Sequence, residues 1–535
     1  MSIDAPATDD LPAQLRAALA AVAERDAVIA RRDALLALRD AQIAEMTTIG
    51  AYREARIKAL ESQLAAMNRQ RFGRRSEQMD PAQRLLFEET LDEDIAAIEN
   101  ELASLRSTPS PRRPPKRLPL PEHLPRVEVR HEPEACTCES CGGALVAMGE
   151  DVTERLDCKP AEFWVERHIY PKYACRACET ITVEPSVPSV IERGRAAPGL
   201  LAHVLISKYA DHLPLYRQQQ IYQRSGIDLA RSTLADWTGA AGVALMPLVA
   251  AMKAALLQQP VIHADETPVA LLDPGAGKTA RAYLFAYTAA NGPPITIFDF
   301  CTSRSGEHAQ RFLGVAAHAD ATGAGAAAFR GSLVVDDYSG YKALFAGGIT
   351  EVGCWAHVRR LYFELHAAQA STQAEHALRF IAELYRIETE AKGLDPPARQ
   401  ALRHHKARPV LDEFQRWIVD VSSRVLPNSG LAKALAHTRK RWPALVRYID
   451  DGLLPIDNNP VERAIRPVAV GRKNWLFAGS KAAGERAAAI MSLIATAKQN
   501  GHEPYAYLKD VLTRLPTHPY RRIAELLPHR WQLAG

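Results

Sequence analysis

The sequence predicts a multidomain α/β protein, and three observations support that fold class. The chain has 535 residues, which at roughly 150 residues per domain is enough for three or four domains. The N-terminal part of the chain contains two different kinds of segment: a region with a seven-residue apolar repeat comes first, and a section with two Cys-x-x-Cys pairs follows it. From residue 261 onward, short β-rich runs are followed by longer helical patterns, as in mixed α/β domains.

Composition excludes several classes of protein. Apolar residues make up 47% of the chain and charged residues 24%, which rules out a wholly disordered chain. The longest apolar stretches, such as Ala487–Ile494, are shorter than the roughly 18–20 residues of a membrane helix. No signal peptide is evident, so we expect a cytoplasmic protein without a membrane partner. Eight cysteines are too few for a disulfide scaffold, and a net charge of +4 neither requires nor excludes a polyanionic partner.

The N-terminal region, residues 11–106, is expected to be helical and zipper-like. Apolar residues recur there at seven-residue steps: Leu15, Val22, Ile29, Leu36, Ile43, Ile57 and Leu64, with only Gly50 breaking the column. A coiled coil also needs a second apolar position in each heptad, and arginines occupy much of that position here. A single amphipathic helix that packs on its own protein is therefore one interpretation. We favour a coiled coil, and hence a homo-oligomer, because a helix this long without an attached core needs a partner. A second helical pattern covers Leu85–Leu105.

Residues 107–121 read as a linker. Six prolines prevent a helix and keep the segment extended. Arg112, Arg113, Lys116 and Arg117 could contact phosphates, although a solvated spacer is an equally good interpretation.

Residues 122–192 are expected to bind structural zinc. Cys138 and Cys141 form one Cys-x-x-Cys turn, and Cys175 and Cys178 form the other; two such turns complete a tetrahedron of thiolates. Between them, Val152–Leu156 and Phe163–Tyr170 alternate as strands do. A site closed by four thiolates has no open position, so it should organise structure and not catalyse. Two further cysteines, Cys136 and Cys158, could replace a ligand.

Residues 198–245 contain a helix-turn-helix candidate. Helical patterns cover Leu200–Leu213, Leu215–Ser225 and Ala230–Ala241, with Gly226 in the turn. The third helix opens with Arg231, Ser232 and Thr233, residue types that suit contacts with DNA in the major groove. A three-helix packing unit without a DNA role explains the same pattern equally well.

Carboxylates follow two β-rich runs in the next segment. The run from Val261 reaches Asp265, and the run from Gly331 reaches Asp336. Acids at the ends of neighbouring strands, joined by a third from a facing helix, can hold a pair of Mg²⁺ or Mn²⁺ ions. Periodicity alone does not choose among the acids here, and taken singly each could be a solvated side chain. The rival acids are Glu266, Asp299, Asp320 and Asp337.

A glycine-rich stretch nearby, Gly275–Thr279, imitates a phosphate-binding loop. The first glycine of that motif is missing, because Leu272 stands in its place, so we expect a hairpin turn and no nucleotide cofactor.

Several long motifs occur in the order found in the transposases of the insertion sequence 66 family, which the chain resembles over nearly its whole length. They follow the zipper-like helix and include the paired Cys-x-x-Cys segment. The others are Arg71–Glu77, His263–Thr267, Asp336–Tyr341, Gly353–Arg360, Asp457–Asn459, Glu462–Pro467 and Gly471–Trp475.

The resemblance implies an RNase H-like catalytic domain, here residues 255–490, with an Asp-Asp-Glu triad. Position by position, Asp265 matches the first aspartate, Asp336 the second and Glu462 the glutamate. The family inserts a helical subdomain before the glutamate, which agrees with the helical pattern at 358–448, and residues 491–535 form a C-terminal helical region. The family usually has glycine after the second aspartate, whereas this chain has Asp337. We keep Asp336, because Asp337 should point to the other side of an extended strand.

The implied activity is DNA transposition: cleavage of the ends of an insertion sequence and strand transfer to target DNA, with two Mg²⁺ or Mn²⁺ ions per active site. Arg466, Arg472 and Lys473 are expected to hold phosphates of the terminal DNA, while Arg463 could instead balance nearby acids. Small proteins of the same element are possible partners. Two other functions remain open: DNA binding without catalysis, and a nuclease that cuts without joining.

Overall fold

The chain divides by its contacts into two units, Met1–Gln70 with Leu102–Ser110, and Arg71–Glu101 with Pro111–Gly535. Its structure is a computed structural model. It describes residues 25, 32, 39, 46, 50, 53–65, 67, 92–102, 120, 122, 124–131, 145–159, 162–175, 178–192, 194–273, 278–315 and 328–533.

In the first unit, residues 53–65 are helical. Leu60 is buried, and Ile57 and Leu64 are half-buried, so the apolar side chains lie along one stripe. Most of the predicted heptad column, Leu15 to Ile43, lies outside the described residues, and the coiled coil therefore stays a prediction.

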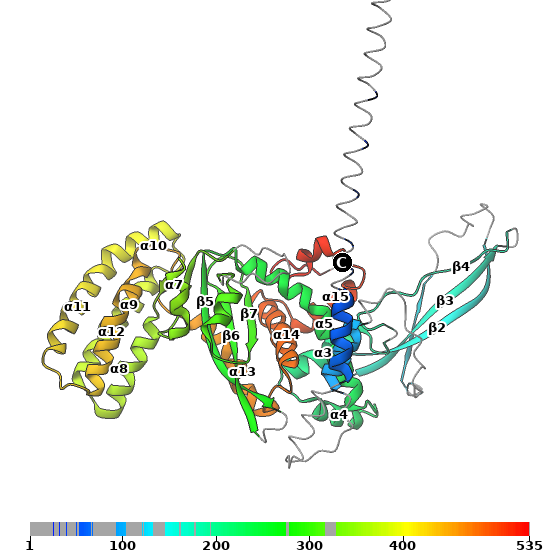
Figure 1. The fold of residues 1–535 in the computed structure, drawn as a ribbon, viewed down its shortest axis with the longest axis horizontal. Helices are drawn as coiled ribbons and strands as arrows, with labels where there is room; N and C mark the ends of the chain where they lie inside the picture. The colour runs from blue at the N-terminus through cyan, green and yellow to red at the C-terminus, as the bar shows by residue number, and fades with distance from the viewer. Residues whose placement is uncertain are drawn as a thin grey trace, which may run out of the picture. The chain divides into compact units, whose positions relative to one another are not determined.

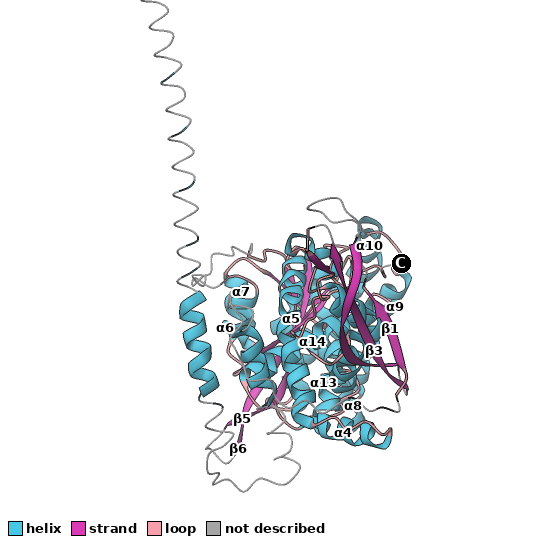
Figure 2. Cartoon of the chain, turned by 90° about the vertical axis from the view of Figure 1, so that its right-hand side faces the viewer, coloured by secondary structure: helices cyan, strands magenta, loops and turns pink. Residues whose placement is uncertain are grey.

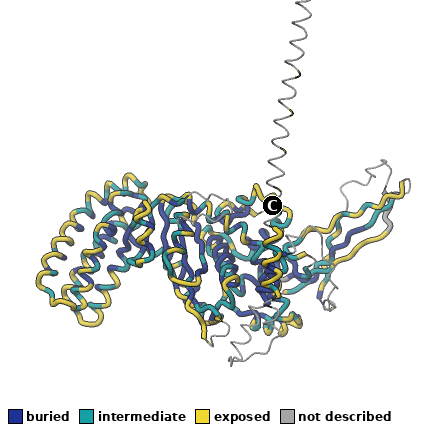
Figure 3. The backbone as a smooth tube through the Cα atoms, in the orientation of Figure 1, coloured by how far each residue is buried: buried dark blue, intermediate teal, exposed yellow. Residues whose placement is uncertain are grey.

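The second unit contains a small sheet built on a long hairpin of β2 (Leu145–Lys159) and β3 (Glu162–Cys175). β2 and β4 (Ile181–Val183) pair antiparallel with β3, and β1 (Arg126–Arg130) pairs parallel with it. Both strands predicted in this region are confirmed and are longer than expected. Residues 149–153 of β2 are exposed, whereas Leu156 of β2 and its partner Val165 of β3 are buried in a core shared with the helices that follow. Figure 3 shows how burial changes along the hairpin.

Three helices follow: α3 (Pro198–Tyr209), α4 (Leu215–Arg224) and α5 (Arg231–Leu256). The prediction that the third helix ends near residue 241 was wrong. Beyond that point Leu245, Leu248 and Met252 are fully buried, and this apolar face carries the helix through Pro247.

α5 also corrects the expectation that no segment reaches membrane-spanning length. Among the described residues it is the one helix long and apolar enough to cross a membrane, with a mean hydropathy of 1.7 over its most apolar window. It contacts α3, α4 and α14 (Lys481–Gln499), and it lies beside α14 in Figure 2. These contacts within the protein account for its apolar composition.

Residues 92–101 form a helix whose first three acidic residues, Asp92, Glu93 and Asp94, are buried in this unit. Glu93 pairs with Lys208 of α3 at 2.9 Å, and Asp94 pairs with Arg486 of α14 at 2.5 Å. The helix also approaches α5 closely, because a Cβ on Gly239 would lie 2.2 Å from the Glu93 carbonyl oxygen.

The central sheet has the order β7-β6-β5-β8-β9. Its strands are β5 (Val261–Asp273), β6 (Lys278–Ala289), β7 (Thr296–Cys301), β8 (Ser332–Val334) and β9 (Thr350–Val352). β6 is antiparallel to β5 and β7, while β8 and β9 run parallel to β5. The strands expected at 281–288 and 295–300 correspond to β6 and β7. The predicted turn near Gly275 joins paired ends of β5 and β6, although residues 274–277 lie outside the described part.

Successive side chains of these strands face opposite sides of the sheet, which separates two cores. Ala286 and Phe298 pack on one face with Val461 and Ile465 of α13 (Asn459–Trp475). Phe285 and Tyr287 belong to the core on the other face, which includes α5 and α6 (Gly306–Phe312). The edge strand β7 is covered by α14, where the Ser492 hydroxyl accepts a hydrogen bond from the Phe298 N–H at 2.8 Å.

The helical insertion has a core of its own. Figure 1 shows α8, α9, α11 and α12 gathered into one bundle. Its elements are α8 (Trp355–Gln369), α9 (Thr372–Glu390), α10 (Pro396–Leu402), a π-helical turn η3 (Arg403–Ala407), α11 (Arg408–Ser422), α12 (Gly430–Val446) and η4 (Arg447–Ile449).

The chain ends with α15 (Pro504–Arg514) and η5 (Tyr520–Leu526). The domain boundary predicted between residues 490 and 491 falls inside α14, because that helix packs on both β7 and α5.

Candidate active site

Strand register brings Asp265 and Asp336 together. β5 and β8 pair in parallel from Val261 with Ser332 to His263 with Val334. Asp265 and Asp336 each lie two residues beyond that last pair. Paired strands are roughly 4.8 Å apart, so the two acids follow backbone segments that are close where the pairing ends. The expectation that both acids end a strand was wrong for Asp265, because β5 continues to Asp273 along its other neighbour, β6.

α13 supplies Glu462 in its first turn, on the sheet face that Asp265 also occupies. A buried network fixes the start of this helix against β5. The His263 ring nitrogen Nδ1 lies 2.9 Å from Asn458 Oδ1, and Asn458 Nδ2 donates to the Ala264 carbonyl at 2.9 Å. The Asn458 N–H donates to Cys354 Sγ at 3.1 Å. Burial lowers the pKa of His263 to about 4, so its ring is neutral at physiological pH.

The pKa of Asp265 reflects its burial and the acids around it. Burial raises the pKa of Asp265 to about 7, with a further rise from the charges of Glu266, Asp336 and Glu462. Its carboxylate accepts a hydrogen bond from the Glu266 N–H at 2.8 Å, which opposes the rise. Carboxylates that repel one another in a half-buried site are a setting in which a cation would be stabilised.

Glu266, the adjacent rival, faces the opposite side of β5 and has partners there. Its carboxylate accepts hydrogen bonds from Arg304 Nε and the Tyr341 hydroxyl, both at 2.8 Å. Its side chain is only 1% exposed, and burial raises its pKa despite these donors. This arrangement ties β5 to the segments after β7 and β8, which suits a positioning role.

Asp337 turns away from the other acids toward cations. Its carboxylate lies 2.8 Å from Lys440 Nζ and 3.4 Å from Lys342 Nζ. Although burial opposes the change, the Lys440 hydrogen bond and neighbouring cations lower the pKa of Asp337. Asp336 instead accepts from the Tyr338 N–H at 2.8 Å and raises the pKa of Asp265. This geometry favours Asp336 over Asp337 as the second acid.

The two remaining rivals do not join the cluster in the described part of the chain. Asp299 lies on β7, where burial raises its pKa and the Cys301 thiol lies 3.5 Å from its Oδ2. Asp320 lies outside the described residues.

Sequence reasoning missed His357 and Arg360, which face Glu462 from α8. His357 Nε2 lies 3.6 Å from Glu462 Oε1, and an Arg360 guanidinium nitrogen lies 3.7 Å from Glu462 Oε2. The ligand atoms of Cys354, His357 and Glu462 all lie within 4.8 Å of one another, close enough to share a metal ion. Burial raises the pKa of the Cys354 thiol to about 12, which disfavours the thiolate. Their motif was visible in the sequence, but nothing in it indicated which acid they face.

The α13 residues predicted to contact DNA differ in their exposure to solvent. Arg466 and Lys473 are exposed. Arg472 is half-buried and donates to the Pro268 carbonyl at 2.7 Å, so part of its guanidinium holds α13 against β5.

The helix-turn-helix residues lie in the first turn of α5. Arg231, Ser232 and Thr233 are half-buried, and residues 237–242 behind them are buried. The predicted DNA contact is therefore partly accessible in the first turn of this helix, whereas residues 237–242 are not accessible. Gly226 adopts a φ of 77° in the preceding turn, as the prediction of a glycine turn requires.

The hairpin places Cys175 and Cys178 at one end. Leu145, which begins β2, pairs with Cys175, which ends β3, and Cys178 follows three residues later. Cys136, Cys138 and Cys141 lie outside the described residues. Cys158 pairs with Phe163 at the opposite end of the hairpin, roughly 40 Å away at 3.3 Å per residue. Cys158 therefore cannot replace a ligand in a site formed by Cys175 and Cys178.

Four family models match segments of the chain. Residues 193–486 match the transposase IS66 family, and residues 492–529 match the IS66 C-terminal element. Residues 135–179 match the zinc-finger binding domain of transposase IS66, and residues 59–129 match the transposase C of IS166 homeodomain.

Three proteins of Sinorhizobium fredii (strain NBRC 101917 / NGR234), all named as uncharacterized, are similar along most of their length. Protein y4jD is 37% identical over 429 residues, covering 77% of this chain and 81% of its own. Protein y4hP is 34% identical over 513 residues, covering 90% of both chains. Protein y4qI is 34% identical over 508 residues, covering 91% of both chains.

Proposed function

The chain belongs to the IS66 family of transposases, and we propose that it binds the ends of its insertion sequence and catalyses metal-dependent DNA cleavage and strand transfer. One observation carries this proposal. The register of β5 and β8 places Asp265 and Asp336 side by side, and the first turn of α13 supplies Glu462 on the same face of the sheet. Separate parts of the chain thus supply one acidic cluster.

The central sheet supports an RNase H-like core. Three antiparallel strands, β7, β6 and β5, are continued by the parallel strands β8 and β9, and the first acid lies on the central strand β5. The helices from Trp355 to Ile449 separate the second acid from the third, as the resemblance implies. A fold of this kind supports many functions, so the acidic cluster carries the assignment.

The acidic cluster fits a pair of divalent cations. Hard carboxylate oxygens suit Mg²⁺ or Mn²⁺, and Glu462 Oε1 is buried with no hydrogen-bond partner among the described residues. Asp265, Asp336 and Glu462 would hold the ions. When bound, such a pair activates the attacking oxygen and stabilises the leaving oxygen of a phosphodiester.

The other residues of the site position the acids and the DNA. The His263–Asn458 contact fixes the first turn of α13 and so the place of Glu462. Arg466 and Lys473 project from the exposed side of α13 and would bind phosphates. Arg231, Ser232 and Thr233 would contact DNA from the start of α5, and the N-terminal helix would join two or more copies of the chain.

The hairpin register makes a prediction for zinc. We expect one Zn²⁺ per chain, held by Cys138, Cys141, Cys175 and Cys178. Cys178→Ser should lose most of the bound zinc and unfold the outer end of the hairpin, because structural zinc stabilises such small sites directly. Zinc content can be measured on the purified full chain by atomic emission spectrometry.

Cys158→Ser is the matched control, since Cys158 lies at the other end of the same hairpin. It should retain the full zinc content. Loss of zinc from this variant, or full retention by Cys178→Ser, would refute the proposed ligand set.

The experiment for the function itself is a strand-transfer assay with Mg²⁺, the full chain, and DNA that carries the ends of its element. We expect joined products of donor and target DNA. Hydrolysed ends without joined products would identify a nuclease. Specific binding without either product would identify a DNA-binding protein that lacks catalysis.

A further inference from the structure

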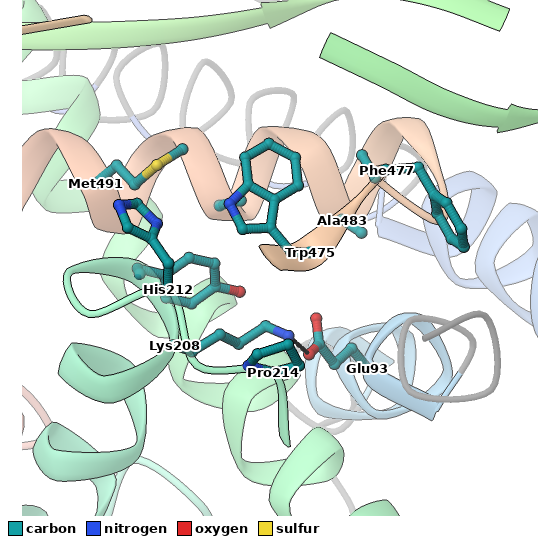
Figure 4. A pocket seen from close by; sticks show the side chains of 11 residues that line it. Glu93, Lys208, His212, Pro214, Trp475, Phe477, Ala483 and Met491 are labelled. Atoms are coloured by element: carbon teal, nitrogen blue, oxygen red, sulfur yellow. Dashed lines mark ion pairs between the residues drawn. The ribbon is translucent and has the colours of Figure 1, made fainter. Parts of the chain in front are cut away.

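A cavity lies at the C-terminal end of α13, distinct from the acidic cluster at its N-terminal end. It has a volume of about 80 Å³ and is partly open to solvent. Its walls are mainly aromatic and apolar, with contributions from Trp475, Phe477, Tyr209, His212 and Met491 (Figure 4).

One side of the cavity is polar. Lys208 and Glu93 face each other there with their charged atoms 2.9 Å apart, as the dashed line in Figure 4 marks. The Glu93 side chain is 3% exposed and the Lys208 side chain 16%. A flat ligand with two apolar faces and a hydrogen-bonding edge matches these walls, because rings can stack on Trp475 while the edge meets the ion pair.

The backbone around the cavity is held in an uncommon conformation. His212 and Leu476 are not glycines, yet they adopt φ angles of 57° and 59°. The His212 ring also lies so near α13 that a Cβ on Gly471 would come within 2.3 Å of it. Non-glycine residues keep such φ angles only where the surrounding structure holds them, and they are more frequent at binding sites than elsewhere.

α13 connects the cavity to the acidic cluster. The 13 residue steps from Glu462 to Trp475 rise roughly 20 Å, about six base pairs of duplex DNA. Arg463, Arg466 and Lys473 are exposed along this length, and none of the three forms an ion pair with a described residue. A DNA strand that follows these cations from the acidic cluster would reach the C-terminal end of α13, which carries Trp475.

We propose that the cavity binds one unstacked nucleobase of the DNA whose phosphodiester lies at the acidic cluster. This inference rests on the proposed function, and it adds a site that distorts the DNA near the reacting bond. Extruding a base costs a few kcal/mol of stacking and pairing. Stacking on an aromatic side chain such as Trp475 offsets much of that cost, and Lys208 and Glu93 would meet the polar edge of the base.

The test uses the full chain with Asp265→Asn, so that DNA is bound without being cut. The probe is a set of duplexes of the element's end, each with 2-aminopurine at one position, whose fluorescence reports unstacking. We expect a change at one position. Adding Trp475→Ala should abolish that change and weaken binding about 5- to 150-fold, since stacking contributes roughly 1–3 kcal/mol per base, whereas Trp475→Phe should retain most of both.

Two further measurements separate base binding from a general loss of structure. Ala487→Phe keeps Trp475 but fills the cavity, and it should also abolish the fluorescence change. On a duplex that lacks the base at the reporting position, Trp475→Ala should bind as tightly as its parent. Trp417→Ala, a partly buried tryptophan of the helical insertion, is the matched control and should change neither quantity.

The proposal is overturned if the parent binds the duplexes but no position reports unstacking, or if Trp475→Ala leaves the signal intact. It is also overturned if the cavity variants change only the oligomeric state, which would identify an apolar side chain of a second copy as the occupant. Absence of any binding by the parent would instead refute the proposed function, and this inference with it.

Discussion

Asp265→Asn and Glu462→Gln should each lower strand transfer by at least roughly a thousandfold. Both substitutions keep the shape of the side chain and remove the negative charge that would hold a divalent cation. A loss of several kcal/mol of transition-state stabilisation corresponds to that change in rate, at about 1.4 kcal/mol per tenfold. The measurement is the rate of joined-product formation with Mg²⁺ and DNA of the element's ends. Binding to the same DNA should remain, because neither side chain would contact phosphate directly.

The second acid provides the matched comparison. Asp336→Asn should lose activity as completely as Asp265→Asn, whereas Asp337→Asn should retain most of it, because Asp337 is paired with Lys440 and Lys342. Glu413→Gln, an exposed acid of α11, should leave the rate unchanged. Inactivity of Asp337→Asn together with activity of Asp336→Asn would reverse the assignment of the second acid.

Asp265→Asn should also stabilise the metal-free protein at pH 8. The pKa of Asp265 is about 7 in the folded chain, against an ordinary value of 3.8. The unfolded state therefore binds fewer protons than the folded state between these values, and stability falls as pH rises from about 4 to about 7. Removing the charge should restore up to about 4 kcal/mol at pH 8, from 1.36 kcal/mol per pKa unit. Thermal unfolding in EDTA, at pH 5 and pH 8, measures the effect.

Asp337→Asn is the control of opposite sign. Lys440 and other cations hold the pKa of Asp337 below its usual value, so its stabilising contribution is present at neutral pH and is lost as pH falls through the folded pKa. This variant should be destabilised at pH 8. Mg²⁺ should raise the melting temperature of the parent and of Asp337→Asn, but have little effect on Asp265→Asn. Equal stabilisation of all three by Mg²⁺ would contradict the site.

The sequence predicted the strands and the order of the parts well where the pattern was local. Alternation identified β6 and β7, and apolar spacing identified α3, α4 and the insertion. Prediction failed where a tertiary contact sets the limit of an element. β5 continues beyond Asp265 because β6 pairs with β5 as far as Asp273. α5 continues beyond residue 241 because its apolar face packs on α14.

The sequence pattern did not show which side chains of the site contact one another. His263, Cys354 and Asn458 stand in three separate motifs, and only folding reveals that they meet at the start of α13. Likewise Arg304, which carried no signal in the sequence, is the residue that pairs with Glu266 and so distinguishes it from Asp265. Long-range contacts of this kind leave no periodicity in a single sequence.

The central claim is that Asp265, Asp336 and Glu462 form one divalent-metal site. The most direct measurement is an anomalous difference map from crystals of the full chain soaked in Mn²⁺. We predict two Mn²⁺ peaks about 3.5–4 Å apart, in contact with all three carboxylates and absent from crystals of Asp265→Asn. A peak bound instead by Cys354, His357 and Glu462, or by Glu266 or Asp337, would contradict the claim.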